Sequence, residues 1–62
     1  MPEIIIYLAE GRTVDAKRAV VKDITDTVVK NFNVPPDAVA IQIVEASKEN
    51  KAKGGVLFSD RK

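Results

Sequence analysis

The chain has 62 residues with no Cys and no His, and its 10 Lys and Arg against 9 Asp and Glu give a net charge of +1. The length predicts a single domain over residues 1–62. Without Cys there is no disulfide, thiolate nucleophile or Cys zinc site, and without His there is no imidazole base. The near-neutral charge argues against binding of nucleic acid or of anionic membranes. No apolar run approaches the roughly 20 residues of a membrane span and no signal-peptide pattern is present, so we expect a cytoplasmic protein.

The small size itself predicts a partner. A domain of about 60 residues buries only about 60% of the surface that its unfolded chain exposes. Such chains usually gain stability from a disulfide, a metal or another chain. A disulfide is impossible here, and the acidic residues are scattered singly, so we expect no metal site. Oligomerisation is therefore the predicted source of stability.

The first two predicted elements are a strand and a helix. Residues 4–8 are β-branched, aromatic or aliphatic, and they are apolar at odd and even positions, so we expect a strand with both faces buried. After a short polar turn, Thr13 is a good N-cap for a helix over residues 14–32, which ends before Pro35-Pro36. One half of its helical wheel is apolar: Ala16, Val20, Val21, Ile24, Val28 and Phe32. Lys17 also falls in this half, where we interpret it as a snorkelling side chain.

The rest of the chain predicts a second strand and a short arm. Residues 39–44 alternate between Val39, Ile41 and Ile43 on one face and smaller or polar residues on the other. Strand, helix and strand make a right-handed βαβ unit with parallel strands, an α/β (α+β) fold. Residues 48–53 read as a polar loop, and residues 56–58 as a short terminal strand or arm. Because one helix covers only one face of a two-stranded sheet, we expect another copy to assemble through the sheets.

Pro2 is the candidate catalytic base. Removal of Met1 would expose a secondary amine that leads directly into the first strand, whereas with Met1 retained the nitrogen is an amide without a basic lone pair. An α-amino group titrates near pH 7.7–8.0, and a general base works best near the operating pH. Arg12 is suited to bind a carboxylate or to stabilise an enolate oxygen. The two residues lie at opposite ends of one strand, so we expect them to meet between subunits.

Other candidates have plainer interpretations. Tyr7 is interpreted as a packing residue with its hydroxyl group at an edge. Lys48, Lys51 and Lys53 form a weak basic cluster that is typical of a solvated loop. Gly54-Gly55 is typical of a simple turn.

Taken together, the residues resemble 4-oxalocrotonate tautomerase, a family of the tautomerase superfamily. The resemblance rests on Met1-Pro2, the Ile-rich first strand, Glu10-Gly11-Arg12, Lys17 in the helix, Pro35, Glu45 at the end of the second strand, Gly54-Gly55 and the length. It implies βαβ subunits that form dimers and a hexamer, a trimer of dimers. It also implies that Pro2 is a general base acting on an enol or dienol 2-oxo acid, that Arg12 binds the far carboxylate, and that no metal or organic cofactor takes part.

Two positions depart from this family. Its second substrate-binding arginine aligns with Ala40, and its pocket aromatic residue aligns with Lys51, which we expect to replace the missing cation and to lower the pKa of the proline. These departures leave two alternatives open. One is a non-catalytic anion-binding or assembly protein on the same fold, and the other is a relative that hydrates or dehalogenates an activated double bond.

Overall fold

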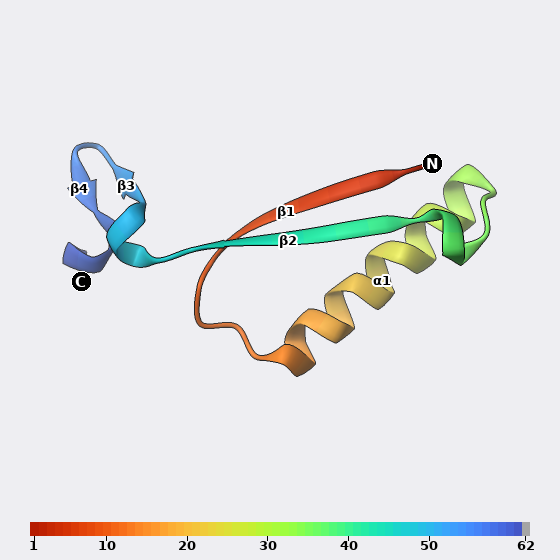
Figure 1. Ribbon diagram of the computed structural model, residues 1–62, viewed down its shortest axis with the longest axis horizontal. Helices are drawn as coiled ribbons and strands as arrows, with labels where there is room; N and C mark the ends of the chain where they lie inside the picture. The colour runs from red at the N-terminus through yellow and green to blue at the C-terminus, as the bar shows by residue number, and fades with distance from the viewer. Residues whose placement is uncertain (62) are drawn as a thin grey trace.

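The computed structural model describes residues 1–61 as a βαβ body, residues 1–46, and a C-terminal arm, residues 47–61. The body contains β1 (Glu3–Ala9), α1 (Val14–Phe32), a 3-10 turn η1 (Pro36–Ala38) and β2 (Ala40–Ala46); the arm contains the 3-10 turn η2 (Lys48–Asn50), β3 (Ala52–Lys53), β4 (Val56–Leu57) and the 3-10 turn η3 (Phe58–Asp60). Figure 1 shows α1 running beneath the two long strands, with the arm standing apart beyond the end of β2.

The two long strands are parallel, as predicted. Their register runs from Glu3 opposite Ala40 to Ala9 opposite Ala46. Two further backbone hydrogen bonds extend the pairing at both ends: Ala40 N–H donates to Pro2 O at 3.0 Å, and Glu10 N–H donates to Ala46 O at 3.0 Å. These bonds fix the chain on either side of β1. Each strand therefore differs from its predicted range by only one or two residues at each end.

The helix begins and ends where the sequence predicts. The Thr13 hydroxyl oxygen accepts a hydrogen bond from Ala16 N–H at 3.1 Å, which caps the start of α1. At the other end Asn33 adopts a left-handed conformation, with φ of 55°, and its N–H donates to Val29 O at 3.0 Å. Asn tolerates this conformation better than most residues because its short polar side chain can bond locally.

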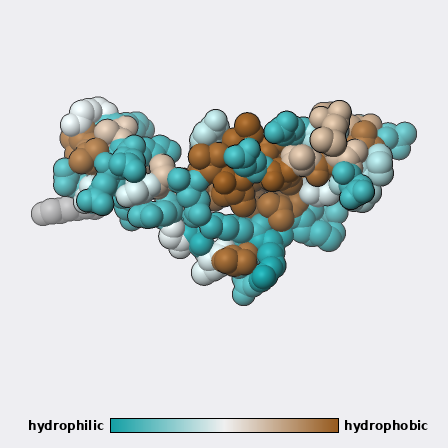
Figure 2. Space-filling view, in the orientation of Figure 1, coloured by the Kyte–Doolittle hydropathy of each residue, from teal (hydrophilic) through white to brown (hydrophobic). Residues whose placement is uncertain are grey.

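The helix covers one face of the sheet. Ile4, Ile6 and Leu8 are partly buried, and alternate with exposed side chains along β1. The partly buried apolar side chains of α1 are Val21, Ile24, Val28 and Val29. Within the predicted apolar half of the helix, Ala16, Val20 and Phe32 remain exposed in the single chain. Figure 2 shows the hydrophobic residues gathered over and between the strands and α1.

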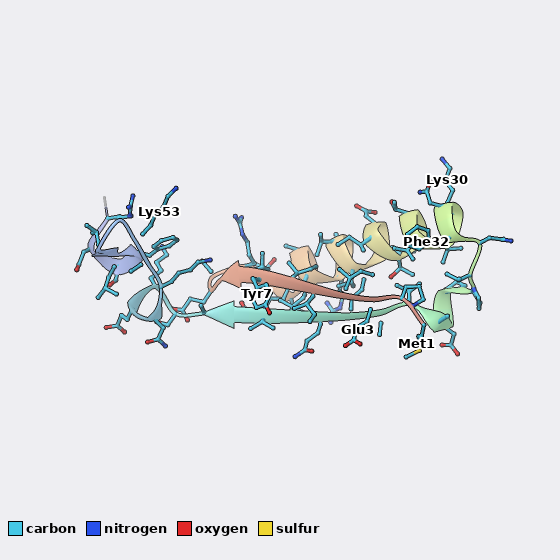
Figure 3. All side chains as sticks on the ribbon, turned by 90° about the horizontal axis from the view of Figure 1, so that it is seen from above. Met1, Glu3, Tyr7, Lys30, Phe32 and Lys53 are labelled. Carbon is cyan, nitrogen blue, oxygen red and sulfur yellow. The ribbon has the colours of Figure 1, made fainter. Side chains whose placement is uncertain are left out.

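The opposite face of the sheet has no cover within the chain. Ile5 is 47% exposed and Tyr7 is 71% exposed. Figure 3 looks onto the strands from the side away from α1, where the Tyr7 side chain lies on β1. No side chain in residues 1–61 reaches full burial. The expectation that both faces of β1 are buried is therefore not met by a single chain. Among the described helices, none is long and apolar enough to cross a membrane.

The arm is more ordered than the predicted loop. Residues 48–53 contain η2 and β3, and β3 pairs antiparallel with β4. Gly54 and Gly55 connect these strands with φ of 62° and 80°, the positive values that a two-residue type I′ hairpin turn requires. Phe58 N–H donates to Lys51 O at 2.8 Å and closes the hairpin base. The loop prediction was wrong because strands of two polar or small residues carry no periodic signal.

Candidate active site

Pro2 and Arg12 lie at opposite ends of β1. Pro2 is partly buried, and its carbonyl is held by Ala40 N–H at the first pair of the sheet. Arg12 follows β1 after Gly11, and the turn after β1 lies at the opposite end of this strand from the N-terminus (Figure 1). The six steps from Glu3 to Ala9 alone extend about 20 Å at 3.3 Å per residue. One chain therefore does not bring the two predicted site residues together.

A tight turn presents Arg12. Gly11 has φ of 115°, a conformation that side-chain-bearing residues rarely adopt, and Thr13 directly after Arg12 caps α1. The turn is thus fixed by the β1 hydrogen bonds on one side and by the helix cap on the other. Arg12 is exposed and forms no ion pair or side-chain hydrogen bond within residues 1–61. Its guanidinium group is consequently free to bind an anion.

An apolar hollow of about 170 Å³ lies beside Arg12, lined by Leu8, Arg12, Ala16, Lys17 and Val20. Lys17 was interpreted from the sequence as a snorkelling side chain. In the structure its Nζ also forms an ion pair with Glu45 Oε1 at 2.7 Å. The two side chains are 25% and 34% exposed, so the pair is partly shielded from water. It ties α1 to β2 and occupies the Lys17 ammonium. The position of Lys17 in the apolar half of the predicted helix was the one indication in the sequence that an acidic residue of the sheet pairs with it.

A second, more polar hollow of about 360 Å³ lies on the strand side of Arg12. It is lined by Leu8, Ala9, Glu10, Gly11, Arg12 and Lys48. Lys48 was interpreted from the sequence as part of a solvated loop, yet the structure places it in the same hollow as Arg12. Only the position of η2 directly after β2 brings it there, and the sequence gives no separate signal for that contact.

Lys51 and Ala40 lie apart from this hollow. The Lys51 Nζ is 5.5 Å from the centre of the Phe58 ring, and the Arg61 guanidinium carbon is 5.9 Å from the same ring, so both cations stack on one aromatic side chain. Ala40 lies opposite Glu3, next to Pro2, and its methyl group donates no hydrogen bond. One chain thus supplies three separate groups: Pro2 with Ala40, Arg12 with Lys48, and Lys51 on the arm.

Within residues 1–61, no group of three His, Cys, Asp or Glu side chains gathers to hold a metal ion. The residues around Arg12 offer cations, backbone groups and one carboxylate, that of Glu10. Such a set can bind an anion and can stabilise negative charge that develops on a bound oxygen. The predicted base, Pro2, lies outside this set, at the other end of β1.

The ion pair between Lys17 and Glu45 is expected to contribute to stability more than an ordinary surface pair. A double-mutant cycle with Lys17→Met and Glu45→Gln should give a coupling energy of about 1 kcal/mol, the upper part of the range for exposed pairs, because both groups are partly shielded. Denaturant unfolding at one fixed protein concentration measures it.

The pair between Lys22 and Asp26 on α1 is the control. Its hydrogen bond raises the pKa of Lys22, but the two side chains are 71% and 59% exposed. A cycle on this pair should give the smaller coupling. Equal coupling in the two cycles would contradict a structural role for Glu45.

Comparison with known proteins identifies the family and the fold of this chain. Residues 2–61 match the family model described as tautomerase enzyme. A probable tautomerase of Bradyrhizobium diazoefficiens is 51% identical over 61 residues, which cover 98% of this chain and 91% of that protein. A solved structure from work on the 4-oxalocrotonate tautomerase isozymes of Methylibium petroleiphilum is 41% identical, with a TM-score of 0.87 over 94% of this chain and 91% of that one.

A second solved structure, a 4-oxalocrotonate tautomerase homologue, superposes with a TM-score of 0.94 at 32% identity and covers 100% of this chain and 98% of its own. The similarity spans the βαβ body and the arm alike. The family resemblance and the α+β fold expected from the sequence are thereby confirmed. The chain belongs to the tautomerase family.

Proposed function

We propose that the chain is a cofactor-independent tautomerase that transfers a proton within enol or dienol 2-oxo acids of the 2-hydroxymuconate type. The observation that carries this proposal is Pro2. It directly precedes β1, is partly buried, and is held by a backbone hydrogen bond in a chain that has no His. Membership of the tautomerase family supports the reaction class.

In this mechanism the Pro2 amine is the general base after Met1 has been removed. It takes a proton from the enol and returns it to a carbon further along the conjugated chain, so the keto form results and the amine is regenerated. Arg12 of another subunit binds the far carboxylate and draws electron density toward it. Lys51 on the arm supplies a further substrate-binding cation and lowers the pKa of the Pro2 amine by charge repulsion.

We propose a homo-oligomer, a hexamer built as a trimer of dimers, working in the cytoplasm on a small-molecule acid, without nucleic acid or membrane partners. The open sheet face supports assembly, because Ile5 and Tyr7 need a second surface to leave water. The separation of Pro2 from Arg12 supports it independently. A complete site requires the end of β1 from one chain and the beginning of β1 from another.

Ala40 favours one competing function, a protein that binds anions on this fold without catalysis. An alanine next to Pro2 donates nothing to a bound carboxylate or oxo group. Addition of water to an activated double bond is the other alternative. Glu10, which lines the Arg12 hollow, is the candidate carboxylate for it. The following experiment distinguishes these functions.

Replacement of the base should remove catalysis and preserve assembly. Pro2→Ala is expected to lower kcat/KM for ketonisation of 2-hydroxymuconate by at least about 100-fold, the usual contribution of general base catalysis. Protein with Met1 retained, as verified by mass spectrometry, should be less active still, because its Pro2 nitrogen is an amide, whereas the trimmed Pro2→Ala variant keeps a primary amine at its N-terminus.

The ultraviolet absorbance of the enol follows this reaction, and size-exclusion chromatography controls for assembly. Unchanged turnover in Pro2→Ala would exclude the proline mechanism. Fully trimmed wild-type protein that binds the acid without converting it would establish the non-catalytic alternative, and a hydrated product would establish the hydratase.

A charge on the open sheet face should prevent assembly. Tyr7→Asp places an unpaired carboxylate on a surface that we propose to be buried between chains, which is strongly unfavourable. Sedimentation velocity should show smaller species, and circular dichroism should show loss of structure at low concentration. Thr27→Asp on exposed α1 is the control and should assemble normally. Normal assembly of Tyr7→Asp would show that this face is not an interface.

A further inference from the structure

Lys48 shares a hollow with Arg12, and neither the sequence nor the proposed reaction assigns it a role. The hollow has a volume of about 360 Å³, at the lower end of the roughly 300–1,000 Å³ that small-molecule sites occupy. Two of its six lining residues are cations, and they come from different segments, the turn after β1 and the η2 turn after β2 (Figure 1).

The backbone holds both cations in place. The Ser47 hydroxyl oxygen accepts a hydrogen bond from Glu49 N–H at 3.2 Å, and Ser47 O accepts one from Asn50 N–H at 2.8 Å. These bonds fix η2, and with it the Cα of Lys48. Glu10 N–H donates to Ala46 O at 3.0 Å, which ties the Arg12 turn to the end of β2 just before η2. The two cations are therefore carried on segments that are bonded to each other.

The other cation beside Arg12 already has a partner. Lys17 forms its ion pair with Glu45. Within residues 1–61, Lys48 and Arg12 form no ion pair, and this includes the Glu10 carboxylate that lines the same hollow. With one carboxylate against two cations, the hollow carries an excess of positive charge.

We propose that Lys48 is a substrate-binding residue that determines specificity for a dicarboxylate. It binds the far carboxylate of the enol acid together with Arg12, with Arg12 as a planar fork and Lys48 as a point charge. This inference rests on the proposed function. It makes Lys48 important only for substrates that carry the second carboxylate, because a monocarboxylate leaves this position empty.

The test compares one dicarboxylate with one monocarboxylate. For Lys48→Met, kcat/KM for 2-hydroxymuconate should fall about tenfold, mainly through KM, as expected for the loss of one charge-assisted contact. The kcat/KM for 2-hydroxy-2,4-pentadienoate should stay within about twofold. Lys48→Arg should keep most of the dicarboxylate activity, because it keeps the charge.

Lys30→Met is the matched control, since it removes the same charge from the last turn of α1, at the end of the molecule away from the arm (Figure 3). It should change neither substrate. An equal fall for both substrates in Lys48→Met, or no fall for either, would overturn the proposal.

Binding of muconate, a dicarboxylate that lacks the 2-hydroxyl group, separates this proposal from the proposed function. Calorimetry should show about tenfold weaker binding to Lys48→Met than to the wild type. If the trimmed wild type converts no enol acid, the proposed function fails and this comparison alone decides the role of Lys48. Equal affinity of the wild type and Lys48→Met for muconate, or no binding of muconate to the wild type, would overturn the proposed role of Lys48.

Discussion

The uncovered face of a two-stranded parallel sheet is the constraint on which the rest of the structure depends. One helix of 19 residues covers one side, and no side chain in residues 1–61 reaches full burial. Two strands and one helix leave apolar groups such as Ile5 and Tyr7 in water, and an isolated two-stranded sheet is marginally stable at best. The proposed assembly would therefore couple the folding of this chain to association and make its stability depend on protein concentration.

The same constraint shapes the site. The strand that needs a partner also separates Pro2 from Arg12 by its own length, about 20 Å over the β1 residues. The proposed base and the proposed anion-binding turn can form one site only when chains lie side by side. In the proposed oligomer, assembly would both bury the open sheet face and complete the site, and each copy would contribute to two sites.

The sequence predicts what depends on local patterns and misses what depends on register. The helix bounds followed from Thr13 and from the polar and proline residues after Phe32, and the parallel strands followed from the apolar runs on either side. Contacts between distant segments were not predictable. The pairing of Lys17 with Glu45 requires the offset between α1 and β2, and the position of Lys48 beside Arg12 requires the direction in which the chain leaves β2.

A site shared between chains is the central claim, and subunit mixing tests it most directly. Pro2→Ala and Arg12→Ala variants, each inactive alone, are unfolded together in equal amounts and refolded. If Pro2 and Arg12 come from different chains, each position is intact at random in about half of the chains. About one quarter of the sites then regain both groups, and about one quarter of the wild-type activity returns. If both act within one chain, no site regains both, and a mixture as inactive as its components would contradict the shared site.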